Sequence, residues 1–363
     1  MHRMARQKLL PFFLPMYGCP HQCVYCDQYA ITGRQTVPSP EQVQRALASF
    51  QGGPQAELAY YGGSFTCLPR RTQAAYLQAA QPALLAGTIG GIRISTRPDR
   101  VDEDTCAFLL EQGVTTVELG IQSFCDSVLE CSGRGYSGET AREACLRIRA
   151  QGFRLGIQLM TGLPGDKDEQ ARSSMVTSLD LGADLLRIYP TLVLAGTELA
   201  RLYRAGTYQP QSLPAAVALC KDLLALAIAG ERPVQRMGLN PSPELERSLL
   251  AGPYHPAFGG LVREALRHGH IHRLLTDCDP ARPGILRFPS RELPLVFGQR
   301  RAGSMALARE FPLLALEPDE SLPPGLLVWE QGSRRVALSE IEYCRSRRTE
   351  LERMDGYGET SSR

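Results

Sequence analysis

The chain reads Cys19-Pro-His-Gln-Cys23-Val-Tyr-Cys26 after the short apolar run Leu10-Pro-Phe-Phe-Leu-Pro-Met16, with two residues between them. This order predicts a first strand that is followed by a loop carrying three thiols. Thiolates are soft ligands, which suits them to iron–sulfur clusters and to zinc. Three thiolates in one loop can each bind one corner of a four-iron cluster and leave the fourth iron open. The spacing therefore predicts a [4Fe–4S] cluster held by Cys19, Cys23 and Cys26.

Zinc is the alternative occupant of such a motif. Structural zinc takes four protein ligands, and no second Cys-x-x-Cys pair accompanies this one in the sequence. His21 could serve as a fourth ligand, but it lies inside the cysteine loop, where a tetrahedral arrangement would be strained. The remaining cysteines are scattered, and we expect them to be small packing residues in a reducing compartment. They are Cys67, Cys106, Cys125, Cys131, Cys145, Cys220, Cys278 and Cys344.

Beyond the cysteine loop, strand-like and helix-like segments alternate. The pattern predicts helices at about 40–50, 69–85, 102–112, 196–204 and 214–229, and strands at 57–61, 91–95, 116–121, 155–160 and 185–189, with a short strand near 234–239. Repeated strand–helix units are typical of a parallel sheet. Together with the first strand, they predict an α/β fold: a partial (β/α)6 TIM-like barrel with a small α+β C-terminal domain.

Polar and glycine residues follow several of the predicted strands. Gly62, Gly63 and Ser64 come after the strand at 57–61, Thr96 ends the next strand, and Gln122 ends the one after that. Two consecutive glycines allow backbone carbonyls to approach a ligand closely. Because active sites on parallel barrels collect at the carboxyl ends of the strands, we expect these residues to surround one ligand.

The spacing of the three cysteines resembles that of the radical S-adenosylmethionine (SAM) superfamily. The resemblance implies that SAM chelates the open iron, and that an electron from the cluster cleaves it to a 5′-deoxyadenosyl radical, which abstracts hydrogen from a substrate. In this superfamily the Gly-Gly-Ser turn binds the methionine amine, and the aromatic residue before the last cysteine, here Tyr25, packs near the adenine. Gly62, Gly63, Ser64 and Thr96 are accordingly predicted to bind the cofactor.

A more distant similarity is to the oxygen-independent coproporphyrinogen oxidases. In that family a glutamine at the end of strand four and an arginine twelve residues later contact SAM, a separation that Gln122 and Arg134 share. The resemblance implies that Arg134 pairs with the methionyl carboxylate. Gln158 falls where that family places a residue that binds the ribose hydroxyls. Surface or helix-capping roles are the alternatives, and no residue is singled out as catalytic.

Three further strings resemble the radical domain of the elongator complex catalytic subunit. They are Thr96-Arg-Pro-Asp99, Val117-Glu-Leu-Gly-Ile-Gln-Ser123 with Ser132-Gly-Arg-Gly135, and Ile188-Tyr-Pro-Thr-Leu-Val193 with Gly196-Thr197. The resemblance covers about residues 8–240, and that family modifies wobble uridines of tRNA. It implies a radical enzyme that acts on tRNA or another RNA, with a reducing partner such as flavodoxin or ferredoxin.

Two departures separate the chain from the elongator family. That family has a longer insertion between its first two cysteines, and it carries an acetyltransferase domain for which we find no acyl-coenzyme A loop beyond Gly260. We therefore do not expect acetyl transfer. The alternatives to an RNA substrate are a small-molecule or tetrapyrrole radical SAM enzyme, and a non-catalytic carrier of the cluster.

We predict four regions: a radical SAM barrel at 1–240, a connector at 241–260, a small α/β C-terminal domain at 261–344 and a flexible tail at 345–363. The segment Leu295-Val-Phe-Gly-Gln-Arg-Arg301 resembles the phosphate-gripping loop of KH modules, which suggests RNA binding; a lid over the barrel is the alternative. His268, His270 and His272 are expected at a solvated helix end rather than at a metal site.

Composition and hydrophobic runs indicate which broad class of protein the chain belongs to. The 363 residues are 43% hydrophobic, which is enough apolar content for a large core. The formal charge is +2, which does not indicate a general binder of polyanions. The first apolar run is short and broken by Pro11 and Pro15, so it does not resemble a secretory signal. No run is long enough to cross a membrane. We therefore expect a cytoplasmic protein.

Overall fold

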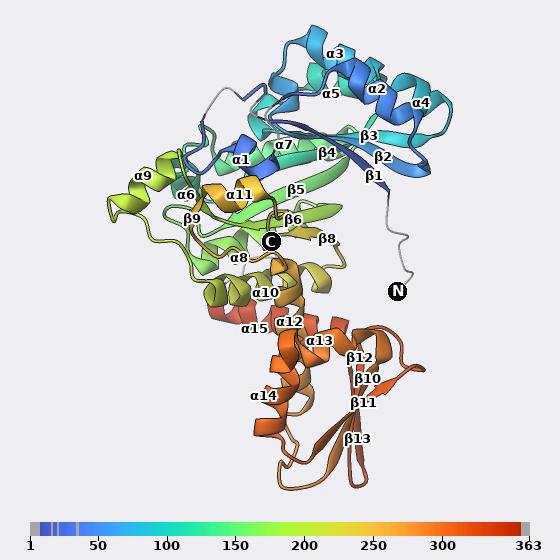
Figure 1. The fold of residues 1–363 in the computed structure, drawn as a ribbon, viewed down its shortest axis with the longest axis vertical. Helices are drawn as coiled ribbons and strands as arrows, with labels where there is room; N and C mark the ends of the chain where they lie inside the picture. The colour runs from blue at the N-terminus through green and yellow to red at the C-terminus, as the bar shows by residue number, and fades with distance from the viewer. Residues whose placement is uncertain (1–7, 16, 20–21, 34–35, 357–363) are drawn as a thin grey trace. The chain divides into compact units, whose positions relative to one another are not determined.

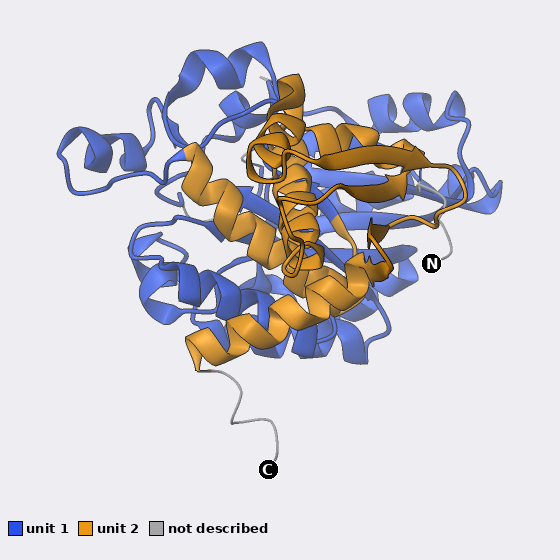
Figure 2. Ribbon diagram, turned by 90° about the horizontal axis from the view of Figure 1, so that it is seen from below, with its two compact units in different colours: residues 1–212, 235–256 blue, residues 213–234, 257–363 orange. Residues whose placement is uncertain are grey.

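The computed structural model of the chain describes residues 8–15, 17–19, 22–33 and 36–356. They form two compact units (Figure 2). Unit 1 comprises Met1–Ser212 and Gln235–Pro256, and unit 2 comprises Leu213–Val234 and Ala257–Arg363. Each unit is described by itself.

Unit 1 is built on a curved sheet (Figure 1). Within the described residues, the sheet order is β1 (Leu9–Leu14), β2 (Gly53–Gly62), β3 (Ile89–Thr96), β4 (Val114–Gln122), β5 (Arg154–Thr161), β6 (Leu185–Pro190) and β8 (Val234–Met237). All neighbouring pairs from β1 to β6 are parallel. The predicted partial barrel is confirmed, and the short strand near residue 234 is a seventh strand at its edge.

The parallel strands are mostly buried, and side chains from several of them line the cavity described below. Between consecutive strands run the helices α2 (Pro40–Ala48), α3 (Arg70–Gln78), α4 (Gln81–Leu85), α5 (Glu103–Glu111), α6 (Asp126–Cys131), α7 (Gly138–Ala150) and α8 (Asp168–Asp180). The side chains of Ser39, Asp102 and Ser137 cap the N-termini of α2, α5 and α7. The single helix predicted at 69–85 is wrong: α3 ends at Gln78 and α4 begins at Gln81, with Pro82 in its first turn, because a proline in a helix interior would remove a backbone hydrogen bond.

Shorter elements complete unit 1. They are α1 (Gln28–Thr32), β7 (Val193–Leu194), α9 (Glu198–Arg204), α11 (Pro243–Ser248) and β9 (Leu249–Ala251). The strand β9 pairs with β7, and Leu245 of α11 is fully buried. Residues 243–251 are therefore ordered parts of unit 1 and differ from the connector that was predicted at 241–260.

Unit 2 combines helices with a second sheet. The helices are α10 (Leu213–Ala229), α12 (Phe258–Leu274), α13 (Leu293–Phe297), α14 (Ala302–Glu310) and α15 (Glu340–Asp355). The sheet order is β11 (Leu314–Asp319), β10 (Gly284–Pro289), β12 (Leu326–Gln331) and β13 (Arg334–Ser339), in which β10 is parallel to β11 and antiparallel to β12. Trp329 and Phe288 are buried at the centre of its core.

The boundaries of unit 2 differ from the predicted C-terminal domain at both ends. The helix α10, which was assigned to the barrel, packs against α12 and α15, because it is apolar around most of its circumference. The predicted flexible tail is helical as far as Asp355. Ser339 and Glu342 form a capping box at the start of α15, and Arg347 pairs with Asp222 of α10 at 3.1 Å. Residues 357–363 lie outside the described residues.

The expected solvated helix end holds for His272, which is exposed in the last turn of α12, but it is wrong for His270. The helix continues to Leu274. His270 is fully buried, stacks on Tyr343 with ring centroids 5.2 Å apart and has its Nε2 3.0 Å from the Leu338 carbonyl oxygen. Burial and the neighbouring Arg267 lower the pKa of His270 to about 3. These contacts give His270 a packing role.

The segment that resembles a KH loop joins α13 to α14. Arg300 and Arg301 both have a left-handed backbone, with φ of 52° and 63°, and the Arg301 guanidinium lies 5.4 Å from the centre of the Phe297 ring. RNA binding by this segment stays a prediction.

In the part of the chain that the structure describes, every helix is too short or too polar to span a lipid bilayer.

Candidate functional site

A cavity of about 650 Å³ opens in unit 1. Its volume lies in the range of ligand-binding pockets. All ten predicted site residues line it: Cys19, Cys23, Cys26, Gly62, Gly63, Ser64, Thr96, Gln122, Arg134 and Gln158. Residues that are up to 139 positions apart in the chain thus meet in one place, because the carboxyl ends of parallel strands share one edge of the sheet.

The three predicted cluster cysteines lie on one loop. Cys23 is buried, and Cys19 and Cys26 are partly buried. The Cys26 amide donates to the Cys23 carbonyl oxygen at 3.0 Å, and the Val24 amide donates to the Ser132 carbonyl oxygen at 3.2 Å, which ties the loop to the segment after α6. Backbone hydrogen bonds therefore help to hold this turn in place.

Burial raises the pKa of two of the three thiols, those of Cys19 and Cys26. Burial, and then the neighbouring Cys23 and Cys19, raise the pKa of the Cys26 thiol to about 12. Metal binding would have to displace these protons. Among the described residues, no three His, Cys, Asp or Glu side chains are arranged around a single metal ion. An iron–sulfur cluster requires the thiols to be farther apart than the ligands of a single metal ion, because each cysteine binds a different iron. His21, the fourth ligand of the zinc alternative, lies outside the described residues.

The glycine turn after β2 brings backbone close to the cysteine side of the cavity. Gly62 has a φ of +102°. A Cβ on Gly63 would lie 1.9 Å from the Tyr17 carbonyl oxygen, so only glycine fits there. Ser64 Oγ lies 3.0 Å from Thr96 Oγ1, which ties the end of β2 to the end of β3. The predicted cofactor residues at these two strand ends therefore form one rigid wall.

Gly63→Ala is expected to displace this wall. The added methyl group must push the turn away from Tyr17, and overpacking of this kind costs about 1–3 kcal/mol of the free energy of unfolding. We expect SAM to bind the reconstituted protein roughly tenfold more weakly, as measured by equilibrium dialysis. Gly260→Ala is the matched control, because its Cβ would lie at an ordinary 3.8 Å from Ala257 Cβ. Equal SAM affinity of the two variants would contradict the assignment of the turn.

Gln122 has two features that are typical of a ligand-binding residue. It has a left-handed backbone with a φ of 69°, and it follows a register shift between β4 and β5. Its side-chain Oε1 is buried and has no hydrogen-bond partner among the described residues. Strained backbone and an unpaired buried polar atom are both costly, and such features concentrate at binding sites. A hydrogen-bond donor on a bound ligand would satisfy this oxygen, and the amine of SAM is such a donor.

Arg134 lies at the cavity wall, but its guanidinium is already engaged. It donates to Tyr136 Oη at 2.8 Å, to Cys23 Sγ at 3.0 Å and to Tyr25 Oη at 3.2 Å, and also to the Gly120 carbonyl oxygen. Arg134 therefore braces the cysteine loop. Its pairing with the methionyl carboxylate stays a prediction; these four bonds use four of the five N–H donors of the guanidinium.

Gln158 belongs to a buried charge network. Its Nε2 donates to Glu118 Oε2 at 3.1 Å, and Glu118 is fully buried. Arg93 donates to Glu118 Oε1 at 2.8 Å, and Arg187 Nε lies 2.9 Å from Glu118 Oε2. The contact of Gln158 with ribose hydroxyls stays a prediction.

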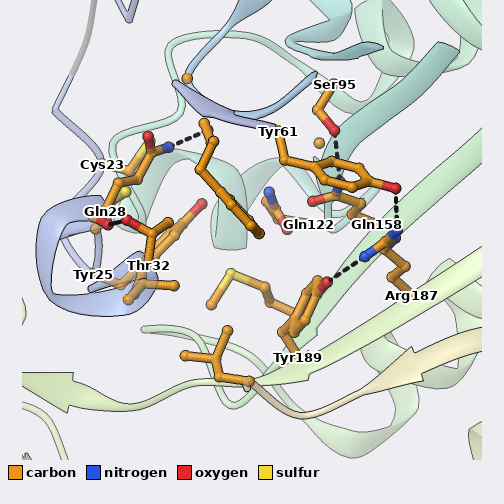
Figure 3. A pocket seen from close by; sticks show the side chains of 18 of the residues that line it. Cys23, Tyr25, Gln28, Thr32, Tyr61, Ser95, Gln122, Gln158, Arg187 and Tyr189 are labelled. Atoms are coloured by element: carbon orange, nitrogen blue, oxygen red, sulfur yellow. Dashed lines mark hydrogen bonds between the residues drawn. The ribbon is translucent and has the colours of Figure 1, made fainter. Parts of the chain in front are cut away.

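The cavity is also lined by residues that the sequence did not predict, among them Tyr61, Arg187, Tyr189 and Arg236. Figure 3 shows three of them, Tyr61, Arg187 and Tyr189, on the side of the cavity away from Cys23 and Tyr25. A signal for two of them was present, because Arg187 and Tyr189 alternate in a strand and so point to the same face of the sheet.

Comparisons with known proteins agree on one family. Residues 13–175 match the radical SAM superfamily, and residues 183–268 match the radical SAM C-terminal domain. The tRNA uridine(34) acetyltransferase of Dehalococcoides mccartyi is 28% identical over 246 residues, which cover 57% of this chain and 54% of that protein. Elongator complex protein 3 of Saccharomyces cerevisiae is 28% identical over 193 residues, which cover 47% of this chain and 34% of that protein.

A solved structure shares the fold. Archaeal Elp3 of Methanocaldococcus infernus with an N-terminal deletion superposes with a TM-score of 0.56 and 21% identity, over 72% of this chain and 62% of that one. The chain spans 54% of the first curated relative and 34% of the second, so about half their length or less.

Proposed function

Because this chain belongs to the radical SAM superfamily, we propose that it cleaves SAM at a [4Fe–4S] cluster and abstracts a hydrogen atom from a nucleotide of tRNA. The observation that carries the proposal is the convergence of the three cysteines and the predicted SAM-binding residues on one cavity. When bound, the cluster supplies the electron that cleaves SAM to a 5′-deoxyadenosyl radical. The protein itself binds, orients and shields the reactants.

The residues divide this work by their position. Cys19, Cys23 and Cys26 hold the cluster. We assign to the Gly62–Ser64 turn, which lines the cavity, the binding of the methionine amine, and to the unpaired Oε1 of Gln122 a further hydrogen bond from SAM. Arg134 keeps the cysteine loop in place through its bonds to Cys23 and Tyr25.

The substrate class rests on the relatives. The curated relatives that match this chain include tRNA uridine(34) acetyltransferases, which favours tRNA over a small molecule. We place the reaction in the cytoplasm, where tRNA is found and where flavodoxin or ferredoxin can supply electrons. Acetyl transfer is not part of the proposal.

The test is anaerobic reconstitution followed by incubation with dithionite and SAM. We expect 5′-deoxyadenosine, measured by chromatography, to accumulate faster with a tRNA that has uridine at position 34 than with the same tRNA carrying cytidine there. Stimulation by coproporphyrinogen and not by tRNA would contradict the RNA assignment. An intact cluster that yields no 5′-deoxyadenosine with any addition would favour a cluster carrier.

A further inference from the structure

Two arginines lie on the cavity wall away from the cysteine loop. Arg187 comes from β6 and Arg236 from β8, and both line the cavity. Arg187 donates to Tyr61 Oη and, at 3.3 Å, to Tyr189 Oη (Figure 3). None of the cofactor-binding roles proposed above uses these four side chains.

The charges at this end of the cavity do not balance. Arg93 and Arg187 share Glu118, and Arg93 also pairs with Glu57. Arg236 Nε donates to the Gly238 carbonyl oxygen at 2.9 Å, and it has no carboxylate partner among the described residues. Arg154 also lies 3.7 Å from Glu57, so positive charge is in excess around these two carboxylates, and an anion from solution or substrate can neutralise Arg236.

The environment of Arg236 agrees with a missing anion. Burial lowers the pKa of its guanidinium, and the positive charge of Arg187 lowers it further, although Tyr189 opposes this. An anion placed between the two arginines would remove their mutual repulsion. Arginine also binds phosphate in a bidentate way, which suits a fixed site of this kind.

We propose that Arg187 and Arg236 bind a phosphate group of the RNA substrate, in the same cavity as SAM. The inference rests on the proposed function and names the part of the site that receives the nucleotide. Two guanidinium groups offer more donors than the two oxygens of a carboxylate accept well, whereas a phosphate has more oxygens to share. The ring of Tyr61 and the apolar side chains of Leu192, Leu194 and Leu239 also line the cavity, and such surfaces accept an unstacked base.

The test compares Arg236→Gln with a matched exposed arginine. Arg247→Gln makes the same charge change on α11, where Arg247 pairs with Glu244 and its side chain is 73% exposed. The cluster-containing protein with SAM bound is titrated anaerobically with uridine 5′-monophosphate, with uridine and with orotate, a pyrimidine carboxylate. We expect Arg236→Gln to bind uridine 5′-monophosphate roughly tenfold more weakly than the wild type. Uridine is expected to bind both proteins equally weakly, and Arg247→Gln should match the wild type.

Two results would overturn the proposal. Equal affinity of Arg236→Gln and Arg247→Gln for uridine 5′-monophosphate would remove the phosphate subsite, and an Arg236-dependent affinity for orotate alone would assign it to a carboxylate ligand. SAM cleavage by the wild type is measured in the same preparation. If SAM is not cleaved but phosphate binding depends on Arg236, the proposed reaction is refuted and the phosphate subsite is supported. If SAM is cleaved but phosphate binding does not depend on Arg236, the phosphate subsite is refuted and the proposed reaction is supported.

Discussion

Cys23→Ala is expected to abolish both the iron–sulfur absorbance of the reconstituted protein and its cleavage of SAM. Cys23 is the buried member of the cysteine trio, and it lies between Cys19 and Cys26 in the loop. Two thiolates cannot hold a four-iron cluster by three corners. The measurements are the visible spectrum, the iron and sulfide content, and 5′-deoxyadenosine formed with dithionite.

Cys67→Ala is the control for this prediction. Cys67 also lies near the site, with its Sγ 3.1 Å from Ser64 Oγ, but it is not among the residues that line the cavity. We expect this variant to keep the cluster and the cleavage activity. Loss of the cluster in Cys67→Ala but not in Cys23→Ala would show that the ligands are assigned wrongly, and stoichiometric zinc without sulfide in the wild type would favour the zinc alternative.

Arg93→Met is expected to cause a large loss of stability. Arg93 is fully buried, and it donates to Glu57 Oε2 and Glu118 Oε1, each at 2.8 Å. Removing the guanidinium leaves buried carboxylates without their main counter-charge. Breaking a buried ion pair in this way costs about 3–5 kcal/mol of the free energy of unfolding. Urea denaturation followed by circular dichroism measures the shift in the unfolding midpoint.

The matched control is Arg282→Met. Arg282 pairs with Asp279 at 3.3 Å, but its side chain is 76% exposed, and exposed pairs contribute about 0–1 kcal/mol. Adding Glu57→Leu to Arg93→Met should recover part of the loss, because one of the unpaired carboxylates is then removed. A midpoint for Arg93→Met as high as that of Arg282→Met would rule out a structural role for the network.

The sequence by itself determined the local features. The predicted cluster ligands lie within one loop, so their spacing can be read directly from neighbouring residues. The strands of the sheet were recognisable because buried parallel strands are short apolar runs that recur between helices. The positions of Gly62, Thr96 and Gln122 at strand ends followed from the same pattern.

Tertiary structure alone decided which distant residues meet. Tyr61, Arg187 and Arg236 come from three different strands, and their meeting in one cavity depends on strand register and on the curvature of the sheet. The packing of α10 with α12 and α15 likewise depends on which apolar faces are complementary, and no local pattern specifies that choice. Side chains far apart in the chain interact only through the folded geometry, so the charge network and the arginine pair could not be read from the sequence.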